Sequence, residues 1–125
     1  MMEFIHPNTF LLQSKRLLGC VNVIVSETYK KRYAAAFGLS PYMTSVLWYR
    51  LAEAQQLDYV LPPKTLPIHL LWGLLFLKLY STEHINSLIC GVDEKTFRKW
   101  VWAVIHAIAD LHSKVVSHGV CVIYC

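Results

Sequence analysis

Apolar side chains recur about every three to four residues over most of the chain, which is the spacing of one helix face. Between residues 26 and 37 the spacing is carried by Tyr29, Tyr33 and Phe37. Ser26 supplies a capping side chain before this stretch, and Gly38 supplies a stop after it. The pattern predicts a helix that begins after Ser26 and ends at Gly38.

A second helix is predicted from Pro41 to about Gln56. Proline is tolerated at the first helical position because its missing N–H has no partner there in any case. The face expected to point to the core carries four residues: Met43, Leu47, Leu51 and Ala54.

The stretch from Leu66 to about Tyr80 is apolar on nearly all sides, which predicts a helix in the middle of a bundle. Its unbroken apolar part is short, whereas a membrane span needs roughly 20 mostly apolar residues. Lys64 and Lys78 also flank the run and His69 interrupts it. We therefore expect no membrane span.

The two ends of the chain have weaker patterns. Residues 9–18 are compatible with a short helix, and residues 21–25 are β-branched and fit either helix or strand. Residues 1–25 are therefore treated as an N-terminal segment of undetermined order and residues 26–113 as the helical domain. Residues 114–125 are expected to form a short non-helical C-terminal tail.

Residues 82–101 read TEHINSLICGVDEKTFRKWV, in which two capped helices flank a glycine. Thr82 caps the first, which runs to about Ile89, and Asp93 caps the second, which runs to about His112. A small residue before the glycine lets the helices approach, and apolar residues after it hold the second helix on the bundle. The positions are filled by Ser87, Gly91, Val92, Phe97 and Val101. The pattern predicts a helix-turn-helix within an all-α bundle of four to five helices.

The second helix of this pair has two faces when it is drawn at about 100° per residue. The apolar back consists of Phe97, Val101, Val104, Ile108 and Leu111, and the front carries cations and aromatics. Cations near the start of such a helix reach phosphates and base edges in the major groove. The predicted DNA-binding residues are Lys95, Thr96, Arg98, Lys99 and Trp102. An ordinary amphipathic helix with a solvated basic front fits the pattern equally well.

Composition supports one packed domain and permits an acidic partner. The 125 residues are 55% hydrophobic and carry a formal net charge of +4, and the mean hydropathy is +0.39. Such a chain buries a core and is not disordered. A second basic run, Lys30, Lys31 and Arg32, is a further candidate for contact with the DNA backbone.

Candidate chemistry is sparse. No glycine-rich phosphate loop, HExxH motif, nucleophile elbow or convincing Cys–His pair is present, so we expect no enzyme and no cofactor. The only ligand-like cluster, His112, His118, Cys121 and Cys125, lacks zinc-finger spacing, so we expect no metal. The N-terminus lacks a secretory pattern, which indicates an intracellular protein with reduced cysteines. The histidines are expected at the surface or half-buried.

Three segments together resemble the N-terminal region of PIF/Harbinger-like transposases of the DDE endonuclease superfamily. They are FGLSP at Phe37 to Pro41, the helix containing Leu71 and Trp72, and KTFRKWVW at Lys95 to Trp102. The resemblance covers Phe37 to about Ser117 and implies a helix-turn-helix that recognises the ends of the element. The family's three catalytic carboxylates have no counterpart here. Residues 111–117 look like the lead into the first strand of the catalytic domain.

The function expected from these observations is binding of double-stranded DNA, in the nucleus, without nuclease or transposase activity. One alternative is a protein-interaction or oligomerisation module, acting as a homo-oligomer or with a separate catalytic subunit. In that case the aromatic residues would cover a partner surface: Trp48, Trp72, Trp100 and Trp102. Another alternative is a decayed transposon-derived fragment.

Overall fold

The computed structural model describes residues 4–58, 61–62, 64–79 and 81–117, and the side chains of all of these except 54–58 and 112–117. The described residues form six helices and no strand, which confirms the all-α prediction. They are α1 (Pro7–Leu17), α2 (Glu27–Phe37), α3 (Pro41–Asp58), α4 (Pro67–Leu79), α5 (Glu83–Cys90) and α6 (Glu94–Ser117). None of the described helices has the length and hydropathy of a membrane span.

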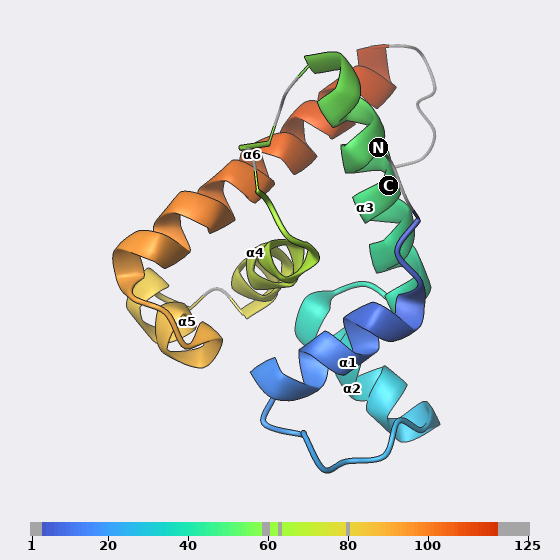
Figure 1. Ribbon diagram of the computed structural model, residues 1–125, viewed down its shortest axis with the longest axis vertical. Helices are drawn as coiled ribbons and strands as arrows, with labels where there is room; N and C mark the ends of the chain where they lie inside the picture. Colours follow the sequence, from blue (N-terminus) through green and yellow to red (C-terminus); the bar gives the residue numbers. More distant parts are fainter. Residues whose placement is uncertain (1–3, 59–60, 63, 80, 118–125) are drawn as a thin grey trace.

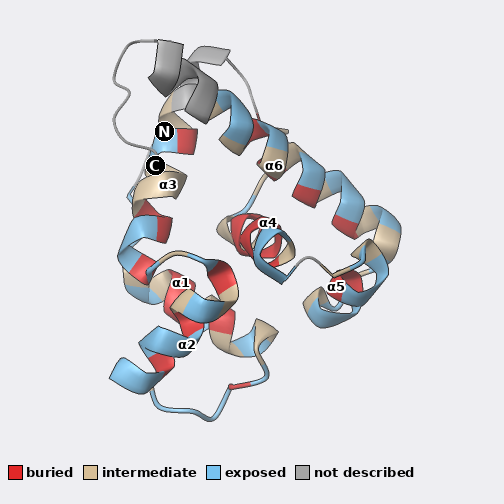
Figure 2. Ribbon diagram, turned by 180° about the vertical axis from the view of Figure 1, so that it is seen from behind, coloured by how far each residue is buried: buried red, intermediate tan, exposed pale blue. Residues whose placement is uncertain are grey.

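Helix α4 lies in the middle of the bundle, as its apolar sequence predicted (Figure 1). It packs against α6 on one side and against α2 and α1 on the other. Residues 69–75 of α4 are all buried, and Figure 2 shows this helix largely in the buried colour. The central helix thus supplies the surface on which α1, α2, α5 and α6 are arranged.

The N-terminal segment adds one helix to the predicted number. His6 caps α1, since its Nδ1 accepts a hydrogen bond from the N–H of Asn8 at 3.1 Å. Phe10 and Leu11 are 0% and 2% exposed, and Ser14 Oγ lies 2.7 Å from the hydroxyl of Tyr29 on α2. The first 25 residues therefore contain a core element, whereas the sequence had left their order undetermined.

The predicted core face of α3 is partly wrong. Leu51 is buried, but Met43 is 47% exposed, while Thr44 and Ser45 are fully buried. The Tyr33 hydroxyl donates to Thr44 Oγ1 at 2.8 Å, and Thr44 donates to the Ser40 carbonyl at 2.9 Å. A polar side chain on α3 is buried because α2 offers it a hydrogen-bond partner. The helix is therefore rotated away from the face that apolar spacing indicated.

The last helix is longer than predicted. Helix α6 extends to Ser117, so residues 114–117 belong to it and not to the expected tail. Each residue added to an existing helix gains a hydrogen bond, which outweighs the weak preference of Val115 and Val116 for strands. The rest of the expected tail, residues 118–125, lies outside the described residues.

Candidate nucleic-acid interface

The turn between α5 and α6 contains the two helix caps and the glycine that the sequence predicted. Thr82 Oγ1 accepts from the N–H of Ile85 at 3.2 Å and caps α5. Gly91 ends this helix with φ +75°, a left-handed conformation that glycine adopts without strain. Asp93 then caps α6, because its carboxylate accepts from both the backbone N–H and the hydroxyl of Thr96, at 3.4 Å and 2.6 Å.

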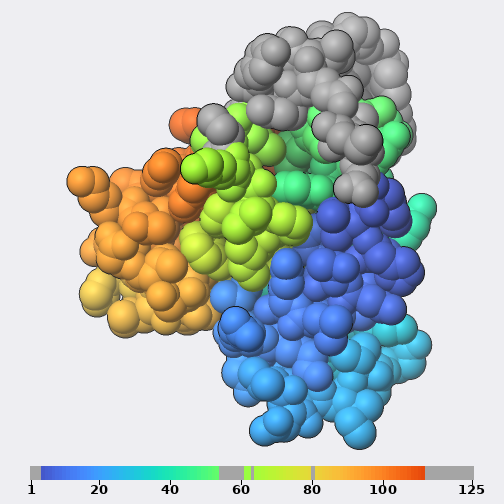
Figure 3. Space-filling model, viewed as in Figure 1, coloured from blue at the N-terminus to red at the C-terminus, as the bar shows by residue number. Residues whose placement is uncertain are grey.

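The back of α6 holds the helix firmly on the bundle. Phe97 and Val101 are 0% exposed and pack with Trp72 of α4 in a cluster of their own. Val104 continues the same face into the main core. Figure 2 shows the buried and exposed residues of α6 on different sides of the helix. The face of α6 opposite Phe97 and Val101 is therefore directed outward, and the helix beneath it is held in place. Together with α5, the first turns of α6 form a lobe of the molecular surface (Figure 3).

On that outer face, Glu83 of α5 binds two of the predicted DNA-binding residues. Its Oε1 accepts from Arg98 Nε at 2.9 Å, and its Oε2 accepts from Trp102 Nε1 at 2.6 Å. These bonds, first the one from Trp102 and then the one from Arg98, hold the pKa of the Glu83 carboxyl below its usual value. The carboxylate is therefore charged at neutral pH and joins α5 to two successive turns of α6.

A second carboxylate moderates the charge of the same face. Arg98 Nη2 lies 3.7 Å from Glu94 Oε2, and His84 Nδ1 lies 3.6 Å from Glu94 Oε1. Arg98 consequently lies between two acidic side chains. The basic front expected from the sequence is in fact a mixed network of cations and carboxylates, and its positive charge is concentrated on the two lysines.

Lys95 and Lys99 are the exposed cations of this face that form no ion pair with the described residues. The Nζ of Lys99 lies 4.7 Å from the centre of the Trp100 ring, a distance that suits a cation–π contact. Lys95 lies in the first turn of α6, next to Thr96, which takes part in the N-terminal cap. These two ammonium groups are the ones best placed to meet a phosphate.

Thr96 and Trp102 have structural partners that the sequence did not predict. The Thr96 hydroxyl donates a hydrogen bond to the Asp93 carboxylate, and the Thr96 side chain is only partly exposed. Trp102 is 39% exposed, and its ring packs edge-on against Phe76, with the ring centres 5.8 Å apart. Both residues stabilise the arrangement of the two helices, and Trp102 also contributes an aromatic edge to the surface.

The second predicted basic patch lies elsewhere, on α2. Lys30, Lys31 and Arg32 are all exposed. Lys30 Nζ lies 3.8 Å from Glu27 Oε1, and Arg32 Nη1 donates to the Sγ of Cys20 at 3.0 Å. Helix α2 and the α5–α6 turn occupy separate parts of the molecule in both ribbon views (Figures 1 and 2). The structure does not join the two patches into one surface.

His69 is an exception to the expectation that the histidines lie at the surface or are half-buried, since it is buried and only 6% exposed. Its ring stacks on Trp100, with the centres 4.1 Å apart and the planes 8° from parallel. Burial, and secondarily the charge of Lys99, lower the pKa of His69 to about 4. Its Nδ1 accepts from the N–H of Leu66 at 3.0 Å, as a neutral imidazole does. The neutral His69 ring therefore packs against Trp100 of α6.

Two further expectations concerned a metal site and the four tryptophans of a partner surface. Among the residues with described side chains, no three His, Cys, Asp or Glu side chains gather closely enough to hold a metal ion. The cluster His112, His118, Cys121 and Cys125 lies outside those residues. Of the four tryptophans assigned to a partner surface, Trp72 is 7% exposed and belongs to the core.

Glu83 is the member of this site that sequence reasoning missed. The sequence places it in the first turn of α5, where a negative charge favours the helix dipole. Its contact with Arg98 depends on the angle between two helices, and no local spacing encodes that angle. Comparison of the chain with protein-family models, with curated proteins and with solved structures found no match in any of the three.

Proposed function

We propose that this chain binds double-stranded DNA through the helix-turn-helix formed by α5 and α6, and that it acts by binding rather than by catalysis. The observation that supports this best is the exposed pair Lys95 and Lys99 on the first turns of a helix whose opposite face is buried. A helix held in this way can enter a major groove while its cations contact phosphates. DNA as the partner implies a nuclear site of action.

The resemblance of residues 37–117 to the N-terminal region of PIF/Harbinger-like transposases supports the same proposal. In that family the corresponding region precedes the catalytic domain and recognises the ends of the element. We carry over the DNA-binding role alone, because the three catalytic carboxylates of the family have no counterpart in this sequence.

Arg98 has a distinct role in this proposal. Glu83 holds its Nε, and Glu94 Oε2 lies 3.7 Å from its Nη2, so the guanidinium is ordered before DNA arrives. An arginine that is already ordered loses less side-chain entropy on binding. We therefore assign base or phosphate contact to Arg98, and phosphate contact to Lys95 and Lys99.

The experiment is fluorescence anisotropy with labelled duplexes of random sequence over a series of salt concentrations. The triple variant Lys95→Ala, Arg98→Ala, Lys99→Ala should bind more weakly, and the slope of log affinity against log salt should fall by about 2 to 3, roughly 0.9 for each lost phosphate contact. The comparison variant Lys30→Ala, Lys31→Ala, Arg32→Ala removes the same charge from α2. Equal losses in the two triple variants, or no loss in the first, would contradict the assignment.

Glu83→Gln adds a second, opposite test at the same face. It removes one negative charge beside Arg98, while the amide oxygen of glutamine can still accept a hydrogen bond from Arg98 Nε, so it should strengthen DNA binding at low salt. Glu27→Gln is the matched control, because Glu27 is an exposed carboxylate on α2 that pairs with Lys30. If both variants change DNA affinity equally, only the net charge matters and the site is not at α5 and α6.

A further inference from the structure

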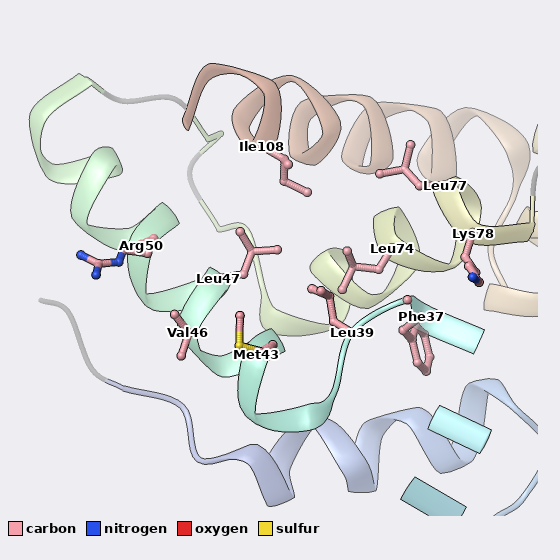
Figure 4. A pocket seen from close by; sticks show the side chains of 11 residues that line it. Phe37, Leu39, Met43, Val46, Leu47, Arg50, Leu74, Leu77, Lys78 and Ile108 are labelled. Atoms are coloured by element: carbon pink, nitrogen blue, oxygen red, sulfur yellow. The ribbon is translucent and has the colours of Figure 1, made fainter. Parts of the chain in front are cut away.

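An apolar groove of about 670 Å³ runs between α3 and α4, away from the α5–α6 turn. It exists because α3 packs on α1 and α6 while α4 packs on α2 and α6, so that the facing sides of α3 and α4 stay apart. Figure 4 shows side chains from α3, α4 and α6 pointing toward one another across it. They are Met43 and Leu47 of α3, Leu74 and Leu77 of α4, and Ile108 of α6, and Leu39 of the connection between α2 and α3 also lines the groove.

The walls of this groove are more exposed than an ordinary core. Met43 is 47% exposed and Leu77 is 39% exposed, although both are large apolar residues. These two exposed side chains border a groove whose floor includes the buried Leu74, 7% exposed, so an apolar partner can contact both the rim and the floor. Methionine in particular adapts its shape to a bound surface. Two helices that form the walls of an open apolar groove are suited to receiving a third.

One end of the groove carries a lysine with no ion-pair partner among the described residues, and the other carries an arginine paired with a carboxylate. Arg50 lies at one end and Lys78 at the other (Figure 4). Arg50 Nη1 lies 3.2 Å from Glu53 Oε1, whereas no described carboxylate lies within ion-pair distance of Lys78. The rim therefore carries a net positive charge, which complements an acidic ligand and repels a basic one.

We propose that this groove docks an amphipathic helix of a partner protein, whose apolar face is flanked by acidic residues. The apolar face inserts between α3 and α4, in the manner of helix-in-groove recognition, with anchors spaced at i, i+4 and i+7. The acidic residues at its ends meet Lys78 and Arg50. This interaction is separate from DNA binding, because the lining residues do not include those of the α5–α6 face.

The test uses labelled helical peptides that carry leucine at i, i+4, i+7 and i+11 with glutamate at both flanks. One matched peptide replaces each glutamate by lysine, and another scrambles the leucine spacing. The full chain should bind the acidic peptide with micromolar affinity, and bind the lysine and scrambled peptides at least about tenfold more weakly. Equal binding of the three peptides, or no binding of the acidic one, overturns the proposal.

Variants locate the binding. Met43→Glu and Leu77→Glu alter side chains that are already exposed, and each should weaken the acidic peptide about tenfold or more. Ile24→Glu, on the 81% exposed Ile24 outside the groove, is the control and should leave the affinity unchanged. Lys78→Glu should weaken the acidic peptide and strengthen the lysine peptide. Far-UV circular dichroism confirms that each variant is folded.

Two other outcomes would overturn the proposal. If Met43→Glu, Leu77→Glu and Ile24→Glu all bind the acidic peptide like the parent chain, the peptide does not occupy the groove. If the unliganded chain sediments as a dimer that Leu77→Glu dissociates, a second copy of the chain occupies the groove instead.

Discussion

At the scale of single residues, Glu83 shows how one side chain connects structure to the proposed function. Its carboxylate accepts hydrogen bonds from Arg98 and from Trp102, which are one helical turn apart on α6. The same two bonds order Arg98 and keep Trp102 against Phe76. Glu83 therefore fixes the front of α6 much as the apolar residues fix its back.

His69 leads to a prediction about pH. Its pKa is lowered to about 4 in the folded protein, from 6.5 in the unfolded chain. Between these values the unfolded chain binds more protons, so stability is full above about pH 6.5 and declines as the pH falls toward about 4. The free energy of unfolding should fall by up to about 1.4 kcal/mol per pH unit in this window.

Urea unfolding between about pH 7 and about pH 5 measures the effect. His69→Gln is the comparison, because glutamine retains a hydrogen-bond acceptor for the N–H of Leu66 and does not titrate. The parent chain should lose more stability than the variant over this interval. Parallel pH profiles would show that His69 does not stay neutral in the fold.

At the scale of elements, the contact between α4 and α6 depends on a glycine. A Cβ placed on Gly73 would lie 3.0 Å from Cγ1 of Val104, closer than such atoms normally come. Val104 is 1% exposed and β-branched, so it has little freedom to move. Gly73 thus allows the central helix to approach the helix that carries the candidate DNA-binding face.

We predict that Gly73→Ala destabilises the protein by about 1 kcal/mol. Overpacking costs about 1–3 kcal/mol, and the better helix propensity of alanine offsets about 1 kcal/mol of this. In the background of Val104→Ala, where the obstructing methyl groups are gone, the same change should be stabilising. A double-mutant cycle measured by urea unfolding gives the coupling, and a value near zero would mean that the two positions do not meet.

At the scale of the whole molecule, α6 connects two proposed surfaces. Its first turns carry Lys95 and Lys99, and its later turns contribute Ile108 to the groove between α3 and α4. Because different turns of the helix are used, the chain has room to hold DNA and a partner helix at once. Both surfaces depend on a bundle that includes the N-terminal helix α1.

That dependence is testable at Phe10, which is 0% exposed. We predict that Phe10→Ala lowers the free energy of unfolding by about 3–5 kcal/mol, the usual cost of removing a buried aromatic ring. Leu12→Ala changes a residue of the same helix that is 62% exposed, and should cost less than about 0.5 kcal/mol. Similar losses in the two variants would show that α1 is not part of the cooperative core.

Helices whose signals are local could be predicted from the sequence alone. Tyr29, Tyr33 and Phe37 predicted the buried face of α2, and the caps Thr82 and Asp93 with Gly91 between them predicted the helix pair α5 and α6. These signals lie within a turn or two of the residues that they specify, so they can be read before the chain folds.

The faces that the helices bury and the ion pairs that they form depend on the tertiary structure. Met43 was expected in the core but is exposed, whereas Thr44 is buried, because Tyr33 of another helix donates a hydrogen bond to Thr44. Arg98 is bound to Glu83 because α5 crosses α6 at that point. Both outcomes depend on contacts between segments that are distant in sequence. The periodicity of a single helix does not specify which segment will pack against it.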